Sequence, residues 1–106
     1  MEVNLVMSKQ KSFNLNIPGK FRWFTTDVFG RDIYFSDKWY KYHIKENHPC
    51  ISEDIIRDTL KNPTKIYGTR SKIYLKKSKQ GTFKVVIRRF NKMLFIITAY
   101  KVNGDN

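Results

Sequence analysis

Two histidines stand close together within residues 39–49, and histidine is the side chain most easily tuned to exchange a proton near neutral pH. His43 lies four residues after Trp39, a spacing that places both side chains on one face of a helix. His43 is therefore a candidate general base or acid, and the alternative is a histidine that merely packs beside Trp39. His48 precedes Pro49, and we interpret it as a cap at the negative end of the helix dipole.

Hydroxyl groups and a fixed cation near the end of the chain add to this chemistry. Thr98 and Tyr100 share one face of the strand predicted over residues 93–102, where their hydroxyls can orient a phosphate or share in proton transfer. Arg88 is a candidate to offset the negative charge that develops on a phosphate. Lys76 joins it if the two strands are adjacent and the two side chains lie on the same face. The predicted catalytic set is His43, Arg88, Thr98 and Tyr100.

The charge of the chain is concentrated in its second half. Residues 1–60 hold 9 basic and 8 acidic side chains, whereas residues 61–106 hold 12 basic side chains and one acid, Asp105. This imbalance indicates a polyanionic partner, for which RNA, including tRNA, is the leading candidate. No basic amphipathic helix is visible that would favour a membrane surface. The alternative is a solvated cationic face. We expect RNA to bind the face made by residues 70–92. The predicted RNA-binding residues are Lys72, Tyr74, Lys76, Lys84 and Lys101, with tyrosine as a stacking platform.

Local patterns predict the elements that must position these residues. Alternating apolar residues predict strands over residues 13–17, 21–26 and 31–35, the last two forming a hairpin. Capping serines and the two following prolines predict helices over residues 37–47 and 53–61. Strands are then expected over residues 64–69, 72–78, 82–90 and 93–102, with Ile73 and Leu75 as the apolar side of the second.

This order predicts an α+β fold in which two helices pack on a four-stranded antiparallel sheet, preceded by an N-terminal β-hairpin. We expect one domain over residues 1–106, with residues 1–12 as a flexible extension. Cys50 has no second cysteine to pair with, which indicates a reducing, cytoplasmic setting. One cysteine and two histidines make a poor zinc set, so we expect neither a metal nor another cofactor.

Four stretches together resemble the phage-type members of the barnase–EndoU–colicin–RelE group of nucleases. They are FSDKWYKYHIKENHP, ISEDIIRDTLKNPTKIY, FKVVIRRF and FIITAYKV, and they span roughly residues 30–102. Members of the group typically show a Trp and a His on the first helix and a last strand ending in Thr-Ala-Tyr. By match, His43 corresponds to the helix histidine, and Thr98 with Tyr100 to the polar pair of the last strand.

The resemblance implies a metal-independent endoribonuclease, toxin-like or phage-encoded, in which an RNA 2′-hydroxyl attacks the adjacent phosphate. It also implies an acidic antitoxin or immunity protein as a partner. The chain departs from the pattern at Cys50, where the group usually has Glu, and Glu53 or Asp54 is the substitute if that Glu only caps the second helix. The alternative function is a non-catalytic basic module that binds RNA or a protein and retains the nuclease fold.

Overall fold

The computed structural model describes residues 21–45, 48 and 51–102, with the side chains of Tyr42 and His43 excepted. The predicted strand over residues 13–17 and the extension over residues 1–12 lie outside this part of the chain. The elements are β1 (Phe21–Thr26), β2 (Asp32–Ser36), α1 (Asp37–Trp39), the π-helix η1 (Tyr40–Lys45), α2 (Glu53–Lys61), β3 (Lys65–Tyr67), β4 (Ser71–Ser78), β5 (Gly81–Phe90) and β6 (Met93–Lys101). No helix among the described residues is long and apolar enough to cross a membrane.

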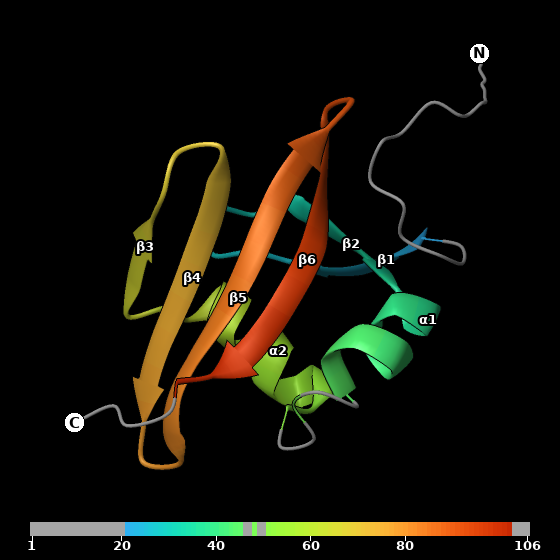
Figure 1. Cartoon of the computed structure of the whole chain (residues 1–106). Helices are drawn as coiled ribbons and strands as arrows, with labels where there is room; N and C mark the ends of the chain where they lie inside the picture. Colours follow the sequence, from blue (N-terminus) through green and yellow to red (C-terminus); the bar gives the residue numbers. More distant parts are fainter. Residues whose placement is uncertain (1–20, 46–47, 49–50, 103–106) are drawn as a thin grey trace.

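The strands form one mixed sheet of six strands in the order β1-β2-β6-β5-β4-β3 (Figure 1). The expectation of a four-stranded antiparallel sheet is therefore wrong. The hairpin β1–β2 joins the same sheet, because β2 pairs in parallel with β6 through Ile33↔Leu94 and Tyr34↔Phe95. Ile33 of β2 is fully buried and Phe95 of β6 is 1% exposed, so both strands lie in the interior of the sheet. The apolar periodicity of a strand does not identify which other strand pairs with it.

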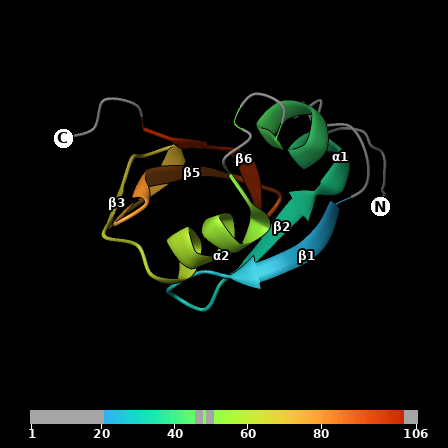
Figure 2. The ribbon, with the colours of Figure 1, turned by 90° about the horizontal axis from the view of Figure 1, so that it is seen from below.

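Helix α2 fills the concave side of this curved sheet and supplies much of the core (Figure 2). Its bounds agree with the predicted helix, and Ser52 caps it by accepting a hydrogen bond from the Ile55 backbone N–H at 3.2 Å. Ile56, Thr59 and Leu60 are buried, and they face the sheet together with the inward side chains of β4 and β5.

The region predicted as one long helix is a single turn of α-helix followed by a π-helix. Strand β2 pairs only with the first part of β6, at Leu94 and Phe95. The helical segment α1–η1 lies against the C-terminal half of β6 (Figure 1). Ile97 is the extra residue where the β5–β6 register shifts, and a bulge residue is left out of the ladder. Its carbonyl instead accepts a 2.6 Å hydrogen bond from Nε1 of Trp39, which fixes the helix beside the strand.

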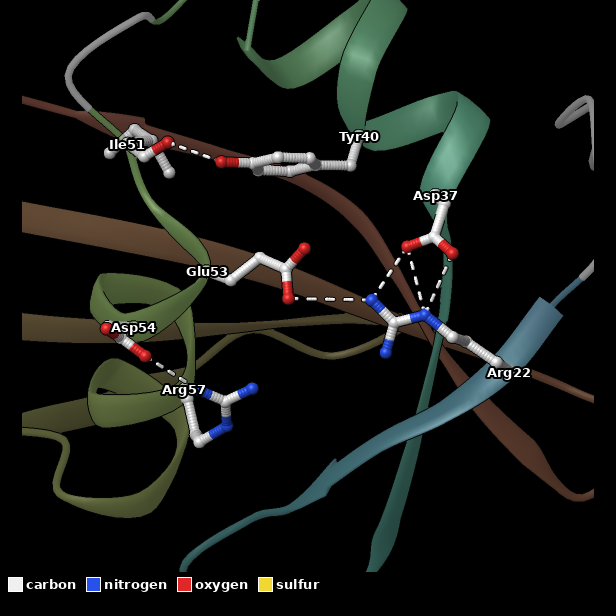
Figure 3. A network of polar contacts seen from close by, with 7 residues as sticks. All are labelled: Arg22, Asp37, Tyr40, Ile51, Glu53, Asp54 and Arg57. Atoms are coloured by element: carbon white, nitrogen blue, oxygen red, sulfur yellow. Dashed lines mark hydrogen bonds and ion pairs between the residues drawn. The ribbon is translucent and has the colours of Figure 1, made fainter.

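A polar network anchors both ends of the connection that carries the histidines (Figure 3). Nε of Arg22, from β1, donates to both carboxylate oxygens of Asp37 at 2.9 and 3.0 Å. Nη2 of Arg22 donates to Asp37 at 2.7 Å and to Glu53 at 3.5 Å. Asp37 opens α1 and Glu53 opens α2, so one guanidinium holds both helix starts. The Tyr40 hydroxyl adds a 2.8 Å bond to the carbonyl of Ile51.

The loop between β1 and β2 is organised by the buried carboxylate of Asp27. Oδ1 accepts from the backbone N–H groups of Phe29 and Arg31 at 3.0 and 2.9 Å. Oδ2 accepts from Nε of Arg31 at 3.0 Å and from the hydroxyl of Tyr74 in β4 at 2.6 Å. Burial favours the neutral acid, yet these bonds, with that of Tyr74 foremost, hold the pKa of Asp27 below its usual range. The carboxylate therefore stays charged in the folded protein.

Asp27→Asn should lower the free energy of unfolding at pH 7 by about 3 kcal/mol, because the change leaves the Arg31 guanidinium without its buried counter-charge. The matched control is Asp54→Asn, whose carboxylate is 94% exposed and pairs with Arg57. Urea unfolding of both variants measures the difference. Equal losses of unfolding free energy in Asp27→Asn and Asp54→Asn would contradict a special structural role of Asp27.

The same substitution should change the response to acid. A carboxyl whose pKa is lower in the folded than in the unfolded state stabilises the fold above the unfolded pKa, near 4, and this contribution is lost as pH falls through the folded value. The wild type should thus lose stability below about pH 4. The Asp27→Asn profile should be shallower there, although Asp37 and Asp58, whose pKa values are also lowered, still contribute.

Candidate nucleic-acid interface

The face of the sheet opposite α2 carries the candidate site, and we call it the open face. Cross-strand register places one row of side chains over β3, β4, β5 and β6, namely Lys65, Leu75, Lys84 and Tyr100. The next row is Tyr67, Ile73, Val86 and Thr98. Members of both rows are partly or fully exposed. Because residues 61–102 contain no Asp or Glu, the positive charge on these strands has no carboxylate of their own to offset it.

Tyr67 stands between two cations of the open face. The ammonium of Lys65 lies 5.3 Å from the centre of its ring, and that of Lys84 lies 5.8 Å away. Such cation–π contacts hold both ammonium groups over the aromatic ring. A base can stack on this ring once the long lysine side chains move from the ring to the adjoining phosphates, so the arrangement suits a nucleotide.

Arg88 lies farther along the same face, opposite Ser71. Its Nε and Nη2 donate to the Ser71 hydroxyl at 3.0 and 2.9 Å, which fixes the plane of the guanidinium. A guanidinium has five donors, so further N–H groups remain for an anion. The predicted residues Arg88, Thr98, Tyr100 and Lys84 are thus brought to one face.

A histidine lies at the β6 end of this face. The ring of His48 is 5.8 Å from the ring of Tyr100, with the two planes inclined at 37°. His48 follows the π-helix, where its backbone N–H donates to the carbonyl of Ile44 at 2.7 Å. The predicted role of His43 concerns a side chain outside the described part of the structure. The helix assumed for its spacing from Trp39 is, over Tyr40–Lys45, a π-helix rather than an α-helix.

Four of the five predicted RNA-binding residues lie on the α2 side of the sheet. Tyr74 is fully buried, so its prediction as a stacking platform is wrong: its hydroxyl belongs to the Asp27 network. Lys76 forms a 2.8 Å ion pair with Asp58 of α2 and faces away from Arg88, so the two do not act together. Lys72 donates to the carbonyl of Gly68 at 2.8 Å, and Lys101 is exposed beside Phe83.

The site includes two residues that the sequence did not single out, Tyr67 and Lys65, and it includes His48, which the sequence predicted only as a helix cap. The alternation of Lys65 and Tyr67 within a short strand was a usable signal, because residues two apart share a face. The proximity of His48 to Tyr100 had no such signal, since it depends on how the π-helix lies against β6.

Comparison with protein-family models, with curated proteins and with solved structures gives no match. Among the described residues, no group of three His, Cys, Asp or Glu side chains is arranged to hold a metal ion. The side chains of the open face offer aromatic rings, hydroxyls, ammonium and guanidinium groups, and one imidazole.

Tyr74→Phe should lower the free energy of unfolding by about 1–3 kcal/mol, because it leaves a buried carboxylate oxygen without its closest donor. Burial and the bond to Asp27 also raise the pKa of Tyr74 to about 12, so the hydroxyl remains a donor at all ordinary pH values. The control is Tyr67→Phe on the open face, which should change stability little. Thermal melts compare the two, and an equal loss in both would show that Tyr74 has no special structural role.

Proposed function

We propose that this protein binds single-stranded RNA through the open face of its sheet. The observation that carries the proposal is the placement of Tyr67 between Lys65 and Lys84, with Tyr100 in the same row as these two lysines. Base–aromatic stacking and phosphate–ammonium contacts are the two interactions by which proteins hold single strands. Single strands fit this geometry better than duplexes, whose bases are stacked on one another and cannot reach a ring.

The affinity for a labelled RNA oligonucleotide should fall steeply with salt, because each neutralised phosphate releases counterions. With Lys65, Lys84 and Arg88 engaged, the slope of log K against log salt should be about −2. Lys84→Gln should reduce that slope by about 0.7, and Tyr67→Leu should weaken binding by 1–3 kcal/mol without changing the slope. The control is Lys61→Gln on α2, on the opposite side of the sheet. Equal effects of Lys61→Gln and Lys84→Gln would refute the assignment to the open face.

The second candidate function is metal-independent cleavage of the bound RNA, and the specific observation in its favour is His48 beside Tyr100. In this scheme the imidazole takes the proton from a 2′-hydroxyl, whose oxygen attacks the adjacent phosphorus. A 2′,3′-cyclic phosphate forms, and the 5′-oxygen leaves with a proton from a second group, for which Tyr100 or His43 is the candidate. Arg88 and Lys84 would stabilise the charge that develops on the phosphate. The sequence resemblance to the barnase–EndoU–colicin–RelE group supports the same reaction.

The setting that goes with this activity is the cytoplasm, where the lone Cys50 stays reduced and RNA is abundant. The cations of the open face also suit an acidic inhibitor protein, which would compete with RNA for the same surface. Such an inhibitor fits a toxin-like or phage-encoded ribonuclease.

Cleavage is tested with diverse RNAs in the presence of a chelator, using wild type, His43→Gln and His48→Gln, with thermal melts beside the assays. We expect His48→Gln to lose roughly two to four orders of magnitude in rate while its melting temperature is unchanged. A loss confined to His43→Gln would instead assign the base to His43. A wild type that binds RNA but cleaves none would leave RNA binding as the whole function.

A further inference from the structure

A second cationic site lies at the end of the sheet near the β5–β6 turn. Two hollows of about 310 and 90 Å³ share three lining residues, Arg31, Arg89 and Leu94. We call the joined hollows the arginine notch. None of Lys65, Tyr67, Lys84 and Tyr100 lines it. Leu94 and Tyr100 are six residues apart on β6, which places these two residues roughly 20 Å apart.

Cations from four separate segments converge on the notch. Its basic lining residues are Arg31, Arg70, Lys72, Arg89 and Lys92. The one carboxylate among the lining residues is that of Asp32, which accepts a 2.8 Å hydrogen bond from the Trp23 indole. Basic groups that only solubilise a surface tend to spread apart, since like charges repel. Their gathering around a hollow indicates an anionic ligand.

Arg31 is held in place before any ligand arrives. Its Nε and Nη2 are bonded to the buried carboxylate of Asp27, and Nη2 also donates to the Tyr74 hydroxyl at 2.7 Å. The guanidinium lies 5.0 Å from the Phe29 ring centre, yet its side chain remains 39% exposed. Nη1 carries two further N–H donors. A guanidinium oriented in this way loses little freedom when it binds an oxyanion.

Lys92 reaches the notch from a backbone conformation that usually selects glycine. The turn between β5 and β6 has positive φ angles at both central residues, 49° at Asn91 and 68° at Lys92. Two-residue hairpin turns of this kind favour Asn-Gly, because glycine has no Cβ to clash. The chain instead has a lysine here, at a conformational cost, and this lysine lines the notch.

We propose that the arginine notch binds a phosphate group, with Arg31 and Arg89 as its principal ligands. Guanidinium groups recognise phosphate through paired hydrogen bonds, and the flanking lysines add charge without a fixed geometry. The phosphate can belong to a free nucleotide or to a nucleic-acid strand. Phosphate binding in the notch does not depend on the proposed function of the open face. Its principal ligands, Arg31 and Arg89, are not among the residues proposed to bind RNA on the open face.

Phosphate binding is measured on the full chain by following arginine Nε–H resonances during titration with inorganic phosphate at constant ionic strength. We expect saturable shifts for Arg31 and Arg89, while Arg57 on α2, which pairs with Asp54, stays in place. Arg89→Gln should weaken phosphate binding about tenfold, the usual consequence of losing a charge-assisted hydrogen bond. The matched control, Arg57→Gln, should leave it unchanged. Shifts that do not saturate, that Arg57 shares, or that chloride alone reproduces would overturn the proposal.

Two further titrations identify the source of the phosphate. Adenosine monophosphate that binds at least as tightly as inorganic phosphate assigns the notch to free nucleotides. Tighter binding of an RNA oligonucleotide, lost in Arg89→Gln, assigns it to a strand. Failure of RNA to shift Tyr67 and Tyr100 while phosphate still shifts Arg31 would refute the proposed function alone. Failure of every phosphate probe to shift Arg31 and Arg89 would refute the notch alone.

Discussion

The buried carboxylate of Asp27 connects the N-terminal hairpin to the antiparallel strands that follow the helices. A buried charge is tolerated only when it is paired and hydrogen-bonded, and Asp27 obtains its partners from its own loop and from Tyr74, 47 residues away. The loop also meets α2, because the Val28 backbone N–H donates to the carbonyl of Leu60 at 3.0 Å. The carboxylate of Asp27 must be paired and hydrogen-bonded because it is buried. This requirement orients Arg31, buries Tyr74 and positions the loop over the core.

Much of the secondary structure could be predicted because its signals are local. Ser52 and Asn62 mark the ends of α2, and alternation of apolar and polar residues marks β4 and β5. The first half of β6 is instead a continuous apolar run, and β6 lies between β2 and β5. The assembly of the sheet could not be predicted, because a period of two identifies a strand without identifying its neighbour. The parallel pairing with β2 and the change to a π-helix after Trp39 both depend on contacts distant in sequence.

The candidate site was predictable only where the choice of face was unambiguous. Thr98 and Tyr100 alternate with the buried Ala99, and their common face followed directly. In β4, apolarity favoured Ile73 and Leu75 as the inner side, yet the protein buries Tyr74 because Asp27 supplies a distant partner for its hydroxyl. Lys76 forms an ion pair with Asp58 of α2, and no pattern within the sequence of its own strand indicates this contact. Charge composition identified a cationic surface but not its division between the open face and the arginine notch.

The short parallel contact between β2 and β6 sets an order for assembly. Strands β3 to β6 are neighbours in sequence, so each closes a small loop onto the last and the group can form early. Ile33 and Leu94 are separated by more than half the chain, so we expect the loop entropy of joining them to be overcome last. During that interval the outer edge of β6 presents unpaired N–H and C=O groups beside apolar side chains, as an edge strand does. A second nascent copy can offer its own β2 to this edge, so exchange of hairpins between chains is the misassembly to which this topology is most exposed.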